Sequence, residues 1–217
     1  LMLHNRAEIW KDKLSLWSDV IKKSPYKARP HMNLAHALDL EGRHEEAARG
    51  YTIALKFSRD GSASAIEILR NLGVARFRLG QLPEAIGIFR RVLIFEPDNV
   101  DILNNLSICL LETGRHDEAL STALHAEGVI PNHGEINSTL GEIYLAIKEY
   151  PKALGYFRKA LKLNPDVPVR YFNAALALEK MGRLSEACLY WEQYLDLEKS
   201  VEESRLVDEH MTEIACP

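Results

Sequence analysis

The sequence has few of the signals that mark a membrane protein, an enzyme or a metalloprotein. No stretch reaches the roughly 18 uninterrupted apolar residues that a membrane-spanning helix needs, and the chain opens on Leu1 without a signal-peptide pattern. HExxH, GxSxG and P-loop motifs are all missing. We therefore expect a soluble piece of a longer protein with no catalytic residue, no cofactor and no metal site.

Cysteine is also scarce, and the three cysteines show neither a CxxC pair nor the Cys/His spacing of a metal site. Cys109 and Cys188 fall inside expected helices, near the face that packs, and Cys216 is almost terminal. We interpret these cysteines as buried free thiols, which leaves the cellular compartment open. The eight histidines likewise offer no paired nucleophile and base.

Positive charge is limited as well. The formal net charge is −4 and no continuous basic stripe runs along the chain, so phosphate attraction is weak and nucleic acid is not an expected partner. The composition, with 47% hydrophobic and 27% charged residues, is that of an ordinary globular protein and excludes little else.

What the chain does contain is a repeat. A small residue two positions after an asparagine or threonine recurs at separations of 38, 34, 34 and 34 residues, and turn glycines and second-helix alanines keep this register. A period of about 34 residues is typical of stacked helical hairpins. The small residues are Ala35, Gly73, Ser107, Gly141 and Ala175; the glycines are Gly42, Gly80, Gly114 and Gly182; the alanines are Ala47, Ala85, Ala119, Ala153 and Ala187.

Most units continue with a bulky residue such as Phe89, and several end with a proline such as Pro97. This pattern resembles the tetratricopeptide repeat (TPR) superfamily. The resemblance implies an all-α fold in which the hairpins form a right-handed superhelical solenoid, here as one domain over 1–217. Full repeats are expected at 28–61, 66–99, 100–133, 134–167 and 168–201, with a partial repeat at 1–27 and a capping helix at 200–217.

The turn and cap residues give finer expectations. Glycine reaches the left-handed conformation that ends a helix without steric cost, which suits the turn inside each hairpin. Lys148 takes this position in the fourth repeat, where the same conformation costs roughly 1 kcal/mol, so we expect a differently shaped turn. Ser64 and Ser200 each precede a glutamate by three residues, the spacing of a capping box. Four additional residues in the run 60–64 are expected to form a longer loop between repeats, and the alternative is a functional insertion.

An asparagine stands two residues before most of the small residues, with threonine in the fourth repeat. First helices line the concave side of a TPR superhelix, so the resemblance implies a ladder of polar groups there. A side-chain amide offers one acceptor and two donors, which match the N–H and C=O of an extended peptide whatever its sequence. The alternative is that these amides bond neighbouring helices. The positions are Asn33, Asn71, Asn105, Thr139 and Asn173, and they resemble the asparagine ladder in the TPR domain of O-linked N-acetylglucosamine transferase.

The same face is expected to add apolar and charged groups to a peptide groove. The clamp with which some TPR domains hold the carboxylate of a chaperone tail is matched at only one position, which argues against that ligand. The further groove residues expected are His36, Arg70, Phe77, Arg78, Ile108, Glu142 and Phe172.

A second resemblance covers about the first 40 residues and rests on Ile9-Trp10-Lys11-Asp12 and Leu16-Trp17-Ser18-Asp19-Val20. It is similar to the junction after the last membrane span in transmembrane and TPR-containing proteins, many of which are glycosyltransferase-like. The similarity implies a membrane-embedded domain upstream in the same polypeptide, and the localisation is otherwise unknown.

The leading hypothesis is therefore a non-enzymatic scaffold that holds an extended peptide or protein segment in its concave groove, attached to a membrane-embedded transferase domain. The alternative is an assembly or oligomerisation module that docks on another domain or another copy through its open first repeat, by Trp10, Leu14 and Trp17. An enzyme within this segment is the weakest option.

Overall fold

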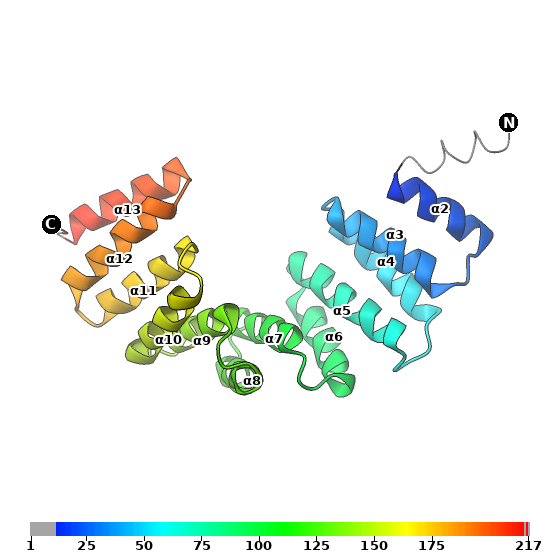
Figure 1. Ribbon diagram of the computed structural model, residues 1–217, viewed down its shortest axis with the longest axis horizontal. Coiled ribbons are helices and arrows are strands. Elements are labelled where there is room, and N and C mark those ends of the chain that lie inside the picture. Colours follow the sequence, from blue (N-terminus) through cyan, green and yellow to red (C-terminus); the bar gives the residue numbers. More distant parts are fainter. Residues whose placement is uncertain (1–11, 215, 217) are drawn as a thin grey trace. The chain divides into compact units, whose positions relative to one another are not determined.

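The computed structural model describes residues 12–214 and 216, and within them it contains twelve α-helices and no strand (Figure 1). The prediction of an all-α helical repeat fold is confirmed. The helices are α2 Lys13–Lys23, α3 Ala28–Leu40, α4 His44–Lys56, α5 Ala63–Arg78, α6 Leu82–Phe95, α7 Val100–Glu112, α8 His116–Val129, α9 Gly134–Ala146, α10 Tyr150–Leu163, α11 Pro168–Lys180, α12 Leu184–Leu197 and α13 Val201–Glu213.

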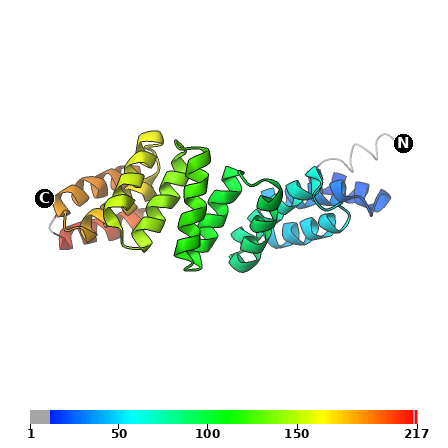
Figure 2. The same cartoon turned by 90° about the horizontal axis from the view of Figure 1, so that it is seen from below.

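The chain divides into two compact units, Leu1–Thr113 and Gly114–Pro217. Within each unit the two helices of a hairpin lie side by side, as α3 does with α4 and α9 with α10 (Figure 2). The first helices of successive hairpins also touch, α3 with α5 in one unit and α9 with α11 in the other. The boundary between the units falls inside the predicted repeat 100–133, and a single domain over 1–217 stays a prediction.

The small residue of a first helix lies against the bulky residue of the second. A Cβ atom on Gly73 of α5 would come within 2.5 Å of Cε1 of Phe89 on α6, far inside the optimum separation of nonbonded carbon atoms. Phe89 is fully buried. The missing side chain therefore lets the ring sit against the neighbouring backbone, which explains why the small and bulky positions recur in one register.

The turns inside the hairpins share a left-handed residue, and Lys148 is one of them. Its φ is 65°, and its N–H donates to the Leu145 carbonyl at 3.0 Å, as the N–H of Gly182 donates to the Glu179 carbonyl at 2.8 Å. The prediction of a differently shaped turn at Lys148 is wrong, because the packing of the flanking helices outweighs a cost of about 1 kcal/mol. The glycines in this conformation include Gly42, Gly80, Gly114 and Gly182, with φ between 69° and 77°.

Helix α5 begins earlier than the repeat pattern placed it. Its N-cap is Ser62, whose hydroxyl accepts a hydrogen bond from the N–H of Ala65 at 3.2 Å and so satisfies a free amide at the helix start. Ser64 lies inside the helix, so the predicted capping box at Ser64 is wrong. The predicted longer loop is present over 57–62, because this connection has two residues more than the connection over 96–99. The other additional residues extend α5 to 16 residues.

Helix α13 packs on α12 at the end of the second unit. Ser200 is its N-cap, as predicted, and accepts from the N–H of Glu203 at 3.3 Å. In a capping box, Glu203 would accept a hydrogen bond from the N–H of Ser200. Here Glu198 Oε1 accepts from that N–H instead, and from the N–H of Lys199, both at 2.8 Å.

A disulfide joins Cys188 of α12 to Cys216, with the two Cα atoms 5.6 Å apart. The interpretation of these two cysteines as free thiols is therefore wrong. The disulfide could not be predicted from the spacing of the two cysteines, because the sulfur atoms meet only when α13 folds back along α12. Cys109 is a free, buried thiol, as predicted.

Arg170 of α11 is buried, with only 1% of its surface exposed. Its guanidinium donates to Glu135 Oε1 of α9 at 2.6 Å and to the carbonyl of Asn164, just after α10, at 3.2 Å. A buried charge needs such partners, since an unpaired one costs several kcal/mol. Arg170 thus links three helices of the second unit.

Candidate functional site

A polar cleft of the first unit lies between α3 and α5. It has a volume of about 800 Å³. Two of the predicted groove residues, Asn33 of α3 and Arg70 of α5, line it together. The other residues that line it are Arg29, Met32, Gly61, Ala63, Ser64, Ile66, Glu67 and Glu96.

Three carboxamides of the predicted ladder belong to the first unit, on α3, α5 and α7. Asn33, Asn71 and Asn105 are each half-buried, and none of their side chains makes a hydrogen bond to another described residue. A half-buried amide that is not used within the fold can still donate and accept. Asn33 alone of the three lines the cleft.

Charged groups of both signs surround the cleft. Arg70 and Glu96 form a long ion pair of 3.7 Å between half-exposed side chains, an arrangement that contributes little to stability. Arg29 and Glu67 are exposed and form no ion pair among the residues that the structure describes. Arg29, Arg70 and Glu67 are thus able to take oppositely charged groups of a ligand.

The remaining predicted residues of the first unit lie outside the cleft. Arg78 donates to the Asp39 carboxylate of α3 at 2.6 Å, and the other oxygen of that carboxylate lies 2.7 Å from His44 Nδ1. Burial raises the pKa of the nearby Tyr51, and the Asp39 carboxylate adds to this shift. His36 is exposed, whereas Phe77 and Ile108 are half-buried.

The predicted residues of the second unit do not form a comparable polar cleft. Thr139 is buried at 3% exposure, Glu142 and Asn173 are half-buried, and Phe172 faces an apolar hollow between α11 and α13. The threonine thus has little surface to offer a ligand.

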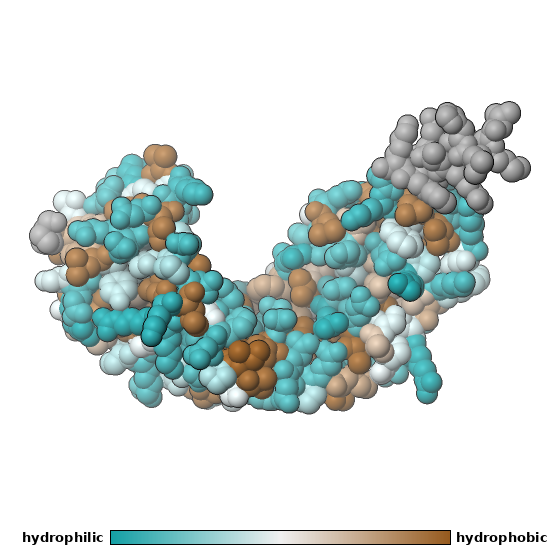
Figure 3. All heavy atoms as spheres, in the orientation of Figure 1, coloured by the Kyte–Doolittle hydropathy of each residue, from teal (hydrophilic) through white to brown (hydrophobic). Residues whose placement is uncertain are grey.

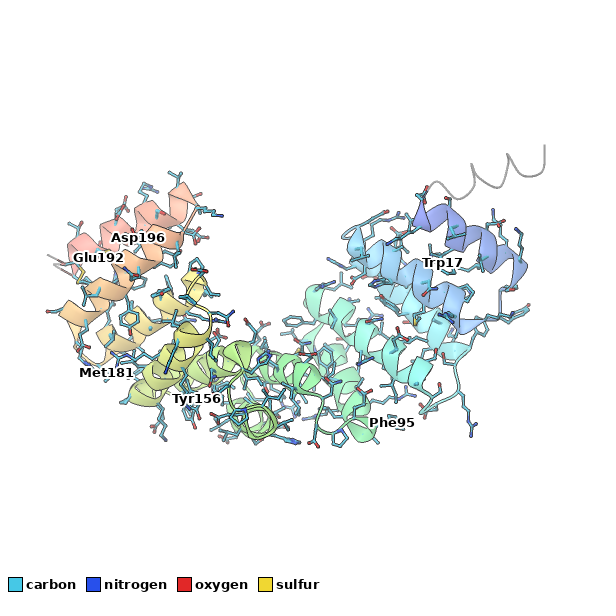
Figure 4. The ribbon with its side chains drawn as sticks, in the orientation of Figure 1. Trp17, Phe95, Tyr156, Met181, Glu192 and Asp196 are labelled. Atoms are coloured by element: carbon cyan, nitrogen blue, oxygen red, sulfur yellow. A yellow bond between two sulfur atoms is a disulfide. The ribbon has the colours of Figure 1, made fainter. Side chains whose placement is uncertain are left out.

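The predicted assembly surface is only partly visible, since Trp10 lies outside the described residues. Leu14 packs against the buried core of the first unit, and Trp17 of α2 is half-buried (Figure 4). Docking through these residues stays a prediction.

Leu124 and Val129 of α8 are each 39% exposed. Figure 3 shows hydrophobic side chains gathered on the surface over this helix. No described helix is both long and apolar enough to cross a membrane. Nor do three or more His, Cys, Asp or Glu side chains converge as a metal site requires, within residues 12–214 and 216.

Sequence reasoning missed several cleft residues. Glu67 was expected to complete the capping box of Ser64 rather than to line a cleft, and the repeat pattern assigned no role to Glu96. The signal that could have found Gly61 was the break in the 34-residue register, since the four added residues begin there or just before it.

Comparison with known proteins identifies the repeat. A family model described as "Tetratricopeptide repeat" matches residues 71–200, and a second with the same description matches residues 34–97. The first match alone covers more than half of the chain, so it shows the family.

Individual relatives match more distantly. Protein FlbA of Caulobacter vibrioides is 29% identical over 154 residues, which cover 71% of this chain and 25% of FlbA. Protein O-mannosyl-transferase TMTC3 of Homo sapiens is 24% identical over 166 residues, which cover 71% of this chain and 18% of TMTC3. The chain therefore spans a quarter or less of the length of both relatives.

Among solved structures, that of YrrB, described as a TPR protein with an unusual peptide-binding site, superimposes with a TM-score of 0.67 at 19% identity. The match covers 89% of this chain and 97% of YrrB. At this level of identity the likeness shows a shared fold.

Proposed function

The chain belongs to the tetratricopeptide repeat family, and we propose that it is a non-catalytic scaffold that holds an extended segment of a partner protein between α3 and α5. TPR proteins in general are scaffolds for protein–protein interaction. The observation that carries the proposal is the polar cleft in which the uncommitted amide of Asn33 lies beside Arg70. The description of YrrB as a peptide-binding TPR protein supports the same class of ligand.

The ligand is recognised mainly through its main chain. Asn33, Asn71 and Asn105 lie at the same position of three successive first helices, and each keeps a free donor and acceptor within the described residues. Neutral hydrogen bonds of this kind contribute about 0.5 to 1.5 kcal/mol each. Three such hydrogen bonds supply useful affinity that does not depend on the side chains of the ligand. Arg29 and Glu67 add a preference for ligands that carry charged side chains.

A peptide selected from a random display library on the 217-residue chain tests this proposal. We expect the affinity of that peptide to fall about tenfold when Asn33 and Asn71 are both changed to alanine. N-methylation of the peptide backbone should weaken binding similarly, because it removes the donors that the amides accept from.

The matched control removes two carboxamides elsewhere, with Asn132→Ala and Gln193→Ala at exposed positions. This pair should leave the affinity within about twofold. If the Asn33/Asn71 variant keeps its helical circular dichroism and still binds with the original affinity, recognition through these amides is wrong.

Attachment to a membrane-embedded, glycosyltransferase-like domain remains part of the proposal. The similarity to TMTC3, which is named as a protein O-mannosyl-transferase, supports it. The sequence immediately upstream of Leu1 in the full-length protein decides the matter, because several long apolar segments are expected there.

A further inference from the structure

The end of the second unit leaves open space between α11 and α13. Helix α13 packs on α12 (Figure 1), and it reaches α11 through His210, whose Nε2 atom lies 2.9 Å from Glu179 Oε1. Two adjoining hollows of about 350 and 440 Å³ lie between α11 and α13. Both are lined by Phe172, Leu206 and Val207, so they form one groove.

Most of the wall of this α11/α13 groove is apolar, and Glu179, Lys180 and His210 line the rim of the larger hollow. Val169 of α11 is 51% exposed and Leu206 of α13 is 53% exposed. Trp191 and Tyr194 of α12 line the buried side, and the Phe172 ring meets Trp191 edge-on with the centroids 4.9 Å apart. Contiguous exposed apolar surface that is rimmed by polar groups marks interaction sites.

One end of the groove is acidic. Glu198 and Glu203 line the smaller hollow, which has no basic residue in its lining. The Ser200 and Lys199 N–H groups lower the pKa of Glu198, and the Tyr194 hydroxyl donates to Glu203 at 3.1 Å. Glu198 is therefore ionised at neutral pH, and carboxylates at this end of the groove attract cationic ligands.

We propose that the α11/α13 groove is a second docking site, which takes a partner-protein segment carrying apolar side chains next to lysine or arginine. The apolar side chains enter against Phe172 and Leu206, and the cation lies beside Glu198 and Glu203. Burial of the apolar groups supplies most of the affinity, and the carboxylates select the basic flank. The site is separate from the polar cleft of the first unit.

Trp191 provides the readout, since it lies in the lining of the groove and is 2% exposed. In a Trp10→Phe/Trp17→Phe background it is the remaining tryptophan of three. The probe is a synthetic peptide of alternating leucine and arginine, titrated at low salt while Trp191 fluorescence is recorded. Val169→Ser with Leu206→Ser should weaken its binding by about tenfold or more.

The charge contribution is tested by Glu198→Gln with Glu203→Gln, because glutamine keeps the hydrogen-bond acceptors and removes the charges. Affinity for the peptide should fall about fivefold and lose most of its salt dependence. The control, Glu84→Gln with Glu192→Gln, removes two charges from exposed positions outside the groove and should change affinity less than twofold.

Three results would overturn the proposal. They are absence of peptide binding, equal binding of a peptide with glutamate in place of arginine, and equal affinity of the groove variants and the control. Sedimentation equilibrium tests whether a second copy of the chain occupies the groove. If the chain self-associates and the Val169/Leu206 variant does not, the ligand is a second copy and the proposal is wrong. Asn33→Ala with Asn71→Ala should leave this peptide unaffected, which separates the site from the first-unit cleft.

Discussion

Gly141 of α9 lies so close to Phe157 of α10 that a Cβ atom on the glycine would stand 2.5 Å from the Cε1 atom of the ring. Gly141 and Phe157 are both buried. The absence of a side chain at Gly141 is thus a packing requirement of the hairpin, although glycine is a poor helix former.

Gly141→Ala should therefore destabilise the protein by about 1 to 3 kcal/mol, because the added methyl group forces the Phe157 ring or the helices apart. Gly155→Ala is the matched control, since Gly155 lies within α10 and a Cβ there meets no atom within 4 Å. The control should gain about 0.5 to 1 kcal/mol from helix propensity. Urea unfolding measures both, and equal stabilisation of the two variants would contradict the packing argument.

Lys148→Gly should raise the free energy of unfolding by up to about 1 kcal/mol. Glycine removes the steric cost of the left-handed backbone, and the greater freedom of the unfolded chain offsets part of the gain. The reciprocal change, Gly182→Lys, places a side chain on a residue with φ of 73° and should lower stability. Thermal unfolding of the two variants checks the opposite signs, and a lower Tm for the glycine variant would count against the strain.

Loss of the Cys188–Cys216 disulfide should lower stability by about 3 kcal/mol, because the bond closes a loop with a sequence separation of 28 residues. Dithiothreitol should destabilise the native chain and leave a Cys188→Ser/Cys216→Ser variant unchanged. Thiol titration of oxidised, denatured protein should find one free thiol per chain. Three free thiols in protein made in an oxidising compartment would show that the bond does not form.

Glu135→Ala should cost about 2 kcal/mol even though the Glu135 side chain is 65% exposed, because it leaves the buried Arg170 guanidinium without its carboxylate. Glu192→Ala removes an exposed glutamate that forms no ion pair with another described residue, and its effect should stay within about 0.5 kcal/mol. Adding Arg170→Met to the Glu135 variant should recover part of the loss, as measured by urea unfolding in a double-mutant cycle. Strict additivity of the two changes would contradict the coupling.

The repeat pattern was enough to predict the helical hairpins, because the same few local rules act in every unit. A small residue such as Gly73 packs against a ring such as Phe89 between the two helices of a hairpin. A glycine such as Gly80 takes the left-handed conformation at the turn between them. Where a local rule was broken, prediction failed: packing of the flanking helices kept Lys148 left-handed, and Ser62 rather than Ser64 became the cap of α5.

The candidate sites were less predictable, since they depend on residues that the repeat does not align. Asn33 and Arg70 were expected on one face, but the cleft beside them also needs Gly61 and Glu96 from segments outside the first helices. The sequence analysis did not single out Arg170, which is buried where three helices meet. The α11/α13 groove likewise depends on how far α13 stands from α11.

Pairing of Cys188 with Cys216 leaves Cys109 as the single sulfhydryl of a chain with three cysteines. Burial raises the pKa of the Cys109 thiol to about 12, so alkylating reagents find almost no reactive thiolate while α7 is closed. The rate at which iodoacetamide modifies Cys109 in the native protein therefore reports how often α7 opens locally. The measurement needs no introduced cysteine.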